Sequence, residues 1–149
     1  MSNLAQAKLP YEATLMVRDT CLCLHVQRAA RALARRFDEA LRPFGLTNGQ
    51  YSLLMTLNRP EPPSIGQLAP FLAMDRTTLT AYLKPLERRG LVEVSIDAKD
   101  RRSRRLRLTQ AGHTALLAAL PIWQSTHDVL EHELNSDPNR LRADLMALA

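Results

Sequence analysis

Residues 97–109 read DAKDRRSRRLRLT, and this basic stretch decides how the rest of the chain is interpreted. It contains one Lys and five Arg. Leu106 and Leu108 alternate with arginines, as in a strand that buries one face. The apolar residues of 92–96 keep the same period of two. Two such runs around a polar turn predict a β-hairpin, so the arginines are displayed on a packed hairpin rather than on a tail or a helix.

Two short helices are predicted directly before the hairpin. Ser64 caps the first and Asp75 caps the second, which ends at Gly90, a residue typical of helix C-termini. Pro70 and Pro85 fall inside these helices and should bend them. About four residues separate the helices, as in a helix-turn-helix. With the hairpin that follows, they predict a winged helix-turn-helix.

Longer helices are predicted on both sides of this domain. Apolar residues from 18 to 41 recur every three or four positions with arginines between them, which predicts an amphipathic helix. Pro121 should kink or break the helix that follows Thr109. We therefore expect a mainly α fold with a small β-hairpin wing. Its expected parts are a flexible N-terminal arm (1–17), helical dimerisation regions (18–45 and 110–149) and a winged helix-turn-helix DNA-binding domain (46–109).

Positive charge is concentrated in the winged domain. Residues 84–107 contain nine basic and four acidic residues, a net +5 that equals the formal charge of the whole chain. Positive charge confined to the recognition helix and wing is the pattern expected for phosphate binding. Double-stranded DNA is therefore the predicted partner, and a winged-helix module that binds protein or RNA is the alternative.

The composition excludes several classes of protein. With 46% hydrophobic residues the chain can bury a core. No apolar run reaches the roughly 18 residues of a membrane span, and the N-terminus does not read as a signal peptide, so a cytoplasmic location without a membrane partner is expected. Cys21 and Cys23 would point to different faces of a helix, so a disulfide-stapled domain is not expected.

Three stretches share their pattern with one protein family. The wing DAKDRRSRRLRLT followed by QAG has the pattern Asp-x-x-Asp-Arg-Arg … Leu-Thr-x-x-Gly. The stretch DRTTLTAYLKPLERRGLVE matches a recognition helix ending in Leu-Glu-x-x-Gly-Leu-Val, and GLTNGQYSLL matches the start of a preceding helix. Over roughly residues 20–120 the chain thus resembles the MarR family of winged-helix transcriptional regulators. This resemblance implies an obligate homodimer in which the N- and C-terminal helices of two chains interlock.

The winged-helix geometry predicts which side chains of the recognition helix contact DNA. Arg76, Thr77 and Thr80 lie in its first turns, where side chains reach base edges in the major groove. Arg76 is the candidate for bidentate recognition of guanine. Lys84 lies further along and is expected at the DNA backbone.

The wing supplies the second set of predicted contacts. Arg101 and Arg102 at its tip are expected in or beside the minor groove, where narrow A·T tracts attract arginine, and Arg104 is a further candidate. Asp97 and Asp100 are expected to pair with wing arginines and to hold the shape of the hairpin.

The effector is predicted only as a class. The common mode of the family, a small aromatic or phenolic acid bound between the dimerisation helices and the winged domain, gives four candidate lining residues: His25, Arg28, Tyr51 and Met55.

A cysteine offers an alternative. One sub-group of the family, the organic-hydroperoxide regulators, carries a reactive cysteine near the start of the first helix, and alignment on Gln50-Tyr51 places Cys23 there. The tyrosines that support this cysteine in the sub-group are matched here by Phe37 and Asn48. A small buried hydrophobe is the other interpretation of Cys23.

Neither catalysis nor a cofactor is predicted. The four histidines show no metal-ligand spacing, and the chain has no Gly-rich phosphate loop or nucleophile motif. We therefore predict a sequence-specific DNA-binding transcriptional regulator that is not an enzyme. It is expected to be a ligand-responsive homodimeric repressor on a near-palindromic operator.

Overall fold

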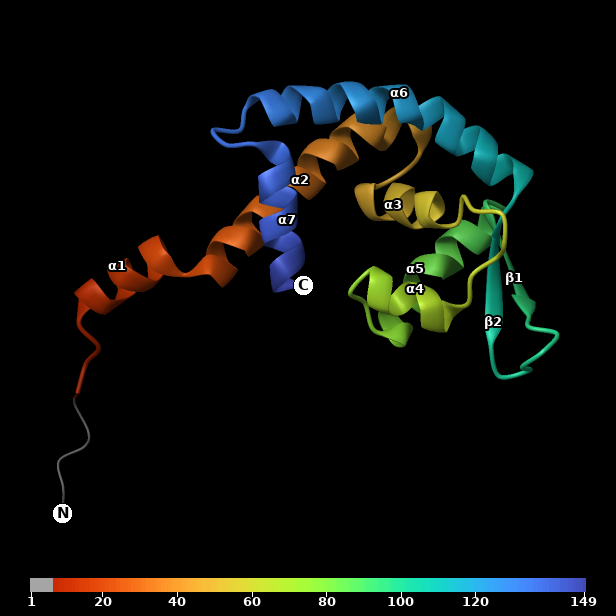
Figure 1. The fold of residues 1–149 in the computed structure, drawn as a ribbon, viewed down its shortest axis with the longest axis horizontal. Helices are drawn as coiled ribbons and strands as arrows, with labels where there is room; N and C mark the ends of the chain where they lie inside the picture. The colour runs from red at the N-terminus through yellow and green to blue at the C-terminus, as the bar shows by residue number, and fades with distance from the viewer. Residues whose placement is uncertain (1–6) are drawn as a thin grey trace, which may run out of the picture. The chain divides into compact units, whose positions relative to one another are not determined.

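The computed structural model describes residues 7–149, and a mainly helical chain with a hairpin wing is confirmed (Figure 1). One unit ends at Arg36, inside a helix, and a second begins at Phe37. The elements in chain order are α1 (Tyr11–Thr20), α2 (Leu22–Leu41), a 3-10 turn η1 (Arg42–Phe44), α3 (Asn48–Thr56), α4 (Ile65–Phe71), α5 (Arg76–Arg88), β1 (Val92–Ile96), β2 (Arg104–Leu108), α6 (Gln110–His132) and α7 (Pro138–Leu148).

The N-terminal unit is helical where the sequence predicts an irregular arm. The expectation for residues 11–17 is wrong, because α1 begins directly after Pro10, whose fixed φ of −60° suits the entry to a helix. The predicted start of the next helix at residue 18 is also wrong, because Cys21 has an extended backbone (ψ 107°) and separates α1 from α2. Residues 1–6 of the predicted arm lie outside the described residues.

Side-chain caps fix where the helices of the second unit begin. Thr47 Oγ1 accepts the Gln50 N–H at 3.2 Å, and Gln50 Oε1 accepts the Thr47 N–H at 3.1 Å. Ser64 and Gln67 make the same reciprocal pair at 3.2 and 2.9 Å. Each capping box satisfies backbone donors that a helix start leaves open. The predicted start of α4 after Ser64 is therefore confirmed, and α3 begins within the stretch GLTNGQYSLL that matches the start of a helix.

The turn of the helix-turn-helix has the predicted length of four residues, from Leu72 to Asp75. Ala73 takes a left-handed backbone conformation there, with φ at 52°. Pro70 and Pro85 stay inside α4 and α5. Pro121 does not break α6, which runs to His132, so the prediction of a possible break there is wrong. The carbonyl that a proline leaves without its helical N–H can be satisfied by water on an exposed surface, and Pro121 is exposed.

The core of the second unit is made mostly of leucine. The fully buried large side chains are Leu41, Leu54, Leu68, Leu79, Leu86 and Leu106. Leu79, Leu83 and Leu86 are the buried face of α5, which leaves the opposite face of this helix in solvent. An aromatic stack extends the core along α6, where the Trp123 ring lies 6.0 Å from Tyr51 and 4.9 Å from His127.

The hairpin pairs β1 and β2 in an antiparallel register that sets Val92 opposite Leu108 and Val94 opposite Leu106. Val92, Leu106 and Leu108 are buried, and Val94 packs against the core. The Leu106 N–H donates to the Pro63 carbonyl at 2.9 Å, so the segment before α4 also lies along β2. The hairpin is therefore anchored at its base while its tip extends from the domain (Figure 1).

Candidate nucleic-acid interface

The exposed face of α5 carries the predicted recognition residues. Asp75 caps the helix, accepting the Thr78 N–H at 2.7 Å and its hydroxyl at 2.9 Å. These hydrogen bonds, led by the one from the Thr78 backbone, lower the pKa of the Asp75 carboxyl. A shallow groove on this face is lined by Arg76, Thr77, Thr80, Ala81 and Lys84. Four of the predicted DNA contacts therefore share one helix face.

Thr80 has its hydroxyl hydrogen committed within the helix. Its Oγ1 donates to the Arg76 carbonyl at 2.8 Å, a local bond that fixes the side-chain rotamer. The hydroxyl oxygen keeps its acceptor capacity and the side chain presents its methyl group. Thr77 is exposed one residue after the first position of the helix.

A group of hydrogen bonds where the wing loop leaves β1 centres on Asp97. Its Oδ2 accepts the Nε and Nη2 of Arg105 at 3.1 and 3.0 Å, and its Oδ1 accepts the Lys99 N–H at 3.0 Å. Arg105 Nη1 also donates to the Pro62 carbonyl at 3.1 Å. The predicted pairing of Asp97 with a wing arginine is present, and the same arginine joins the hairpin to the segment before α4. The guanidinium group of Arg105 is therefore used in hydrogen bonds within the protein.

Asp100 differs from its predicted role. It accepts the backbone N–H of Arg102 at 3.0 Å, and its own carbonyl accepts the Ser103 N–H at 2.9 Å. No arginine side chain in the described part of the chain pairs with its carboxylate. The expectation of an ion pair at Asp100 is therefore wrong. The tight turn between the strands brings a backbone donor, rather than a guanidinium, to this side chain.

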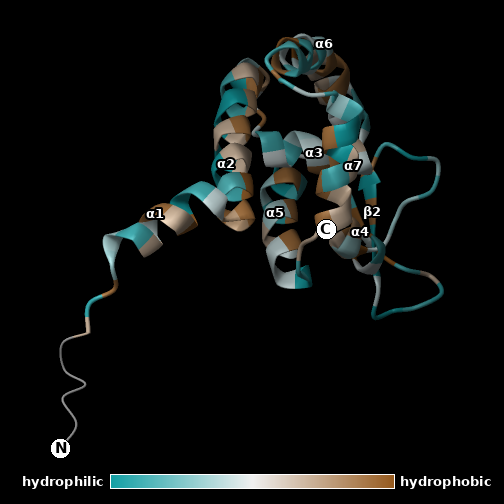
Figure 2. Cartoon of the chain, turned by 60° about the vertical axis from the view of Figure 1, so that its left-hand side comes forward, coloured by the Kyte–Doolittle hydropathy of each residue, from teal (hydrophilic) through white to brown (hydrophobic). Residues whose placement is uncertain are grey.

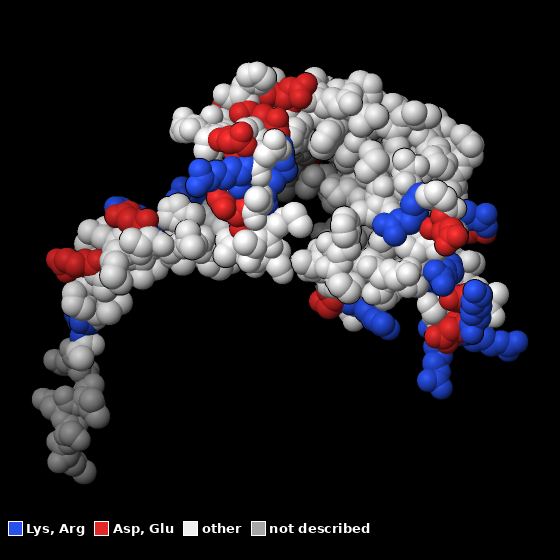
Figure 3. Space-filling view, viewed as in Figure 1, with Lys and Arg blue, Asp and Glu red and all other residues white. Residues whose placement is uncertain are grey.

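The arginines of the wing tip differ in how they are engaged. Arg101 and Arg102 are exposed, and among the described residues their guanidinium groups have no hydrogen-bond or ion-pair partner. Arg104 Nη1 donates to the Arg101 carbonyl at 3.1 Å, and Arg107 lies 3.7 Å from Glu93. The view in Figure 3 shows Lys and Arg side chains gathered over the hairpin, with acidic residues among them. Arg101 and Arg102 are thus wing arginines that are available to an anionic partner.

A cleft of about 430 Å³ joins the two sets of predicted contacts. It lies between α4, α5 and the wing, and its lining residues are Ser64, Ile65, Gly66, Arg76, Thr80, Asp100, Arg102, Ser103 and Arg104. The sequence predicts the arginines and Thr80 as DNA contacts but gives no role to Gly66. A glycine at the second position of a helix after a Ser cap is the only sequence feature that could have drawn attention to it.

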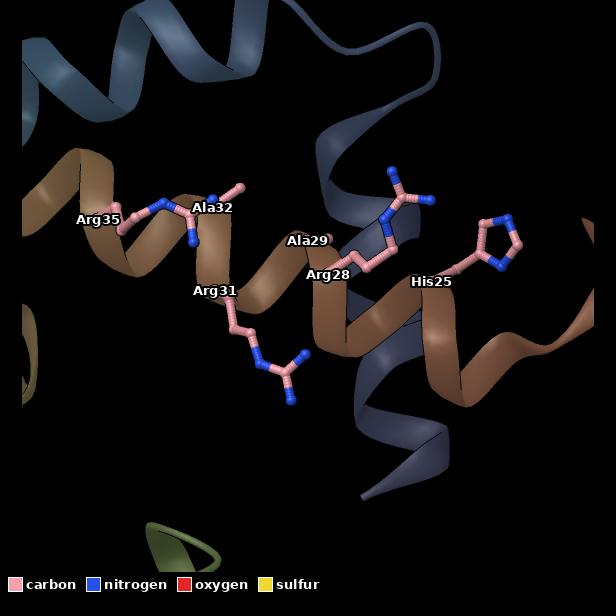
Figure 4. Close-up of a pocket in the computed structure, with 6 residues that line it drawn as sticks. All are labelled: His25, Arg28, Ala29, Arg31, Ala32 and Arg35. Carbon is pink, nitrogen blue, oxygen red and sulfur yellow. The ribbon is translucent and has the colours of Figure 1, made fainter. Parts of the chain in front are cut away.

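The proposed effector residues fall into two groups. Tyr51 is buried in the core against Trp123, and burial raises the pKa of its phenol. Met55 packs against the same core. His25 and Arg28 lie in the N-terminal unit, on a groove of α2 of about 530 Å³ that they share with Ala29, Arg31, Ala32 and Arg35 (Figure 4). Figure 4 shows the side chains of Arg28 and Arg31 pointing to different sides of the helix.

The two cysteines lie around the break between α1 and α2. Cys21 sits in the extended link and accepts the Leu24 N–H at 3.4 Å, whereas Cys23 is exposed in the first turn of α2. The argument that both thiols are on one helix is therefore wrong, because only Cys23 is helical. Gln27 Nε2 donates to the Cys23 sulfur at 3.2 Å. An exposed thiol with a polar donor contrasts with the buried hydrophobe that was the other interpretation.

Residues 7–149 contain no group of three or more His, Cys, Asp and Glu side chains placed to hold a metal ion. None of the helices in this range is long and apolar enough to cross a bilayer.

A helix-turn-helix followed by an arginine-rich hairpin defines the winged helix class. A sequence profile of the MarR family matches residues 46–103. A crystal structure of the M. tuberculosis transcriptional regulator MosR in complex with DNA is similar, with a TM-score of 0.79 and 38% identity over 86% of this chain and 92% of that one. The chain belongs to the MarR family.

Of two curated relatives, one is named a repressor of transcription and the other an activator. The chain is 34% identical to the transcriptional repressor MprA of Escherichia coli, over 75% of this chain, and 34% identical to the transcriptional activatory protein BadR of Rhodopseudomonas palustris, over 74% of it. It matches 61% of the length of each of these relatives.

Proposed function

We propose that the protein is a DNA-binding transcriptional regulator that acts as a homodimer and has no catalytic activity. The observation that carries this proposal is the pairing of two unengaged wing-tip arginines, Arg101 and Arg102, with the exposed polar face of α5. A recognition helix in the major groove with a wing on the adjacent backbone uses both surfaces together.

Exposed apolar side chains support the dimer. Neither α1 nor α7 buries a residue within the described chain, although both contain hydrophobic residues (Figure 2). The exposed set comprises Tyr11, Met16, Val17, Leu22, Val26 and Leu33 near the N-terminus, and Val129, Leu145, Met146 and Leu148 near the C-terminus. Apolar surface gathered on whole helices is typical of protein interfaces. We propose that residues 18–45 and 110–149 form the dimerisation region and residues 46–109 the DNA-binding domain.

A dimer places two recognition helices on half-sites about 34–36 Å apart, so the operator should be a near-palindrome. We propose repression of transcription as the outcome of binding, relieved by a small aromatic or phenolic acid. A promoter-reporter assay with and without the regulator decides between repression and activation.

The test of DNA binding is fluorescence anisotropy with duplexes from the DNA flanking the coding region, against a shuffled duplex, between 50 and about 200 mM salt. We expect tighter binding to one flanking duplex and a steep salt slope for both. Equal, salt-insensitive binding to both duplexes would contradict the proposal. Sedimentation of the wild type beside Leu145→Glu and Met146→Glu variants tests the dimer, which the charged variants should dissociate.

Cys23 supports a second candidate, a regulator released from DNA by thiol oxidation. It rests on the exposure of this thiol, which leaves the sulfur open to an oxidant, and on the hydrogen bond that Gln27 donates to it.

A further inference from the structure

Gly66 of α4 lies against the guanidinium group of Arg76 of α5. A Cβ atom added at residue 66 would meet Arg76 Nη2 at 3.1 Å and Cζ at 3.9 Å. Gly66 is exposed, and its backbone is not in the left-handed region, so any residue could adopt its conformation. Glycine in a helix is less favourable than alanine. What the glycine provides here is room for an arginine.

The end of the Arg76 side chain lies beside Gly66. Both residues line the cleft between α4, α5 and the wing, together with Arg102 and Arg104. Asp100 lines the same cleft, and its carboxylate accepts a hydrogen bond from the Arg102 backbone N–H. Three arginines and one aspartate therefore line the cleft, so basic residues are in excess there.

The first helix of a helix-turn-helix crosses the sugar-phosphate backbone, while the second lies over the bases. In this chain α4 is the first helix, so an arginine that lies against α4 is placed at the backbone. Arginine binds phosphate oxygens through two parallel N–H donors.

We propose that Gly66 is a positioning residue for DNA binding: by lacking a side chain it seats Arg76 in this cleft, where Arg76 binds a backbone phosphate rather than guanine. The inference rests on the proposed function, and it replaces the guanine-reading role that the sequence suggests for Arg76. A phosphate contact contributes to binding of every duplex and to its salt dependence.

The test is Gly66→Ala, measured by anisotropy on the preferred duplex and on single-base variants of it. The added methyl group displaces the end of Arg76, so we expect binding about five- to tenfold weaker on every duplex and a salt slope smaller by about one. Because alanine suits a helix better, the melting temperature should rise by a few degrees. A loss of binding in a more stable protein is a result that damage to the fold cannot produce.

Two further variants complete the test. Arg76→Ala should weaken binding by a similar factor, and adding Gly66→Ala to it should cause no further loss. Ser52→Ala, at an exposed helical position of α3, is the matched control and should leave binding unchanged. Three results would each overturn the inference. They are wild-type affinity in Gly66→Ala, a further weakening of about five- to tenfold when Gly66→Ala is added to Arg76→Ala, and a relaxed preference at a single base pair in Gly66→Ala. If the wild type itself bound no duplex, the proposed function would fail first.

Discussion

Asp97 pairs with Arg105 where the wing loop leaves β1, with the carboxylate Oδ2 3.0 Å from the guanidinium Nη2. Arg105 also reaches the Pro62 carbonyl, so one side chain ties the loop after β1, strand β2 and the segment before α4 together. The side chain of Asp97 is 12% exposed, which limits competition from water. The angle of the wing, and with it the position of Arg101 and Arg102, therefore depends on this pair.

The Asp97 pair gives stability a dependence on acid pH. The Lys99 N–H, followed by Arg105, lowers the pKa of the Asp97 carboxyl below its ordinary value. A lowered folded-state pKa contributes stability above the pKa of the unfolded chain, and this contribution is lost as pH falls through the folded value. We expect Asp97→Asn to be less stable than the wild type at neutral pH, with the two converging below about pH 4. Thermal melts across pH 2–7 measure this, and a constant difference across that range would argue against it.

The wing-tip arginines should contribute non-specific affinity. Replacing both Arg101 and Arg102 by alanine removes two guanidinium groups that have no partner among residues 7–149, so the fold should be unaffected. We expect all duplexes to bind more weakly, with a log–log salt slope reduced by about 1–2. Arg107→Ala is the control, because Arg107 lies beside Glu93 and should change the slope less. An unchanged slope in the double variant would show that the wing does not touch the DNA.

Gly112 should tolerate no side chain. A Cβ atom there would lie 2.4 Å from the Leu91 carbonyl oxygen and 2.6 Å from Leu108 Cδ1. The first of these is backbone and cannot move aside, so α6 would have to shift from the hairpin. We expect Gly112→Ala to lower the free energy of unfolding by about 2–3 kcal/mol, as overpacking of a core does. Urea unfolding measures it, and a loss below about 0.5 kcal/mol would contradict this packing.

The sequence predicts where a helix begins when the capping residue bonds to a donor only a few positions away. Thr47, Ser64 and Asp75 cap helices through donors three residues away, and such spacing can be read directly from the sequence. Gly112 belongs to the Leu-Thr-x-x-Gly pattern. Glycine is needed there because of the Leu91 carbonyl, and Leu91 is 21 positions earlier in the chain. Contacts at that separation depend on the finished fold.

The errors arise where local and long-range effects compete. A proline and mixed polarity suggest an irregular arm before residue 18, yet Pro10 is compatible with the start of a helix. Asp100 looks equivalent to Asp97 in sequence, but turn geometry gives it a backbone donor. The contact between Arg76 and Gly66 is made between two helices, and neither residue alone predicts it.

Ala73 is strained by the turn between α4 and α5. An L-residue with φ at 52° carries a steric cost that glycine does not have. We expect Ala73→Gly to raise the free energy of unfolding by up to about 1 kcal/mol, since relief of the strain outweighs the added freedom of the unfolded chain. Ala118→Gly, in the exposed face of α6, is the matched control and should lower it by about 1 kcal/mol. Equal destabilisation by both substitutions would show that position 73 is unstrained.

Oxidation of Cys23 should decide between the two candidate modes of release from DNA. A hydroperoxide converts the thiolate to a sulfenic acid, with the peroxide reduced to an alcohol. The added oxygen changes the hydrogen bonding of a side chain that now accepts from Gln27 at 3.2 Å. If the protein is a thiol sensor, organic hydroperoxide should release the preferred duplex, dithiothreitol should restore binding, and Cys23→Ser should be insensitive. Cys21→Ser is the control for the neighbouring thiol. Binding that is indifferent to peroxide in the wild type would exclude Cys23 as the sensor, and titration with aromatic and phenolic acids would then test the first mode directly.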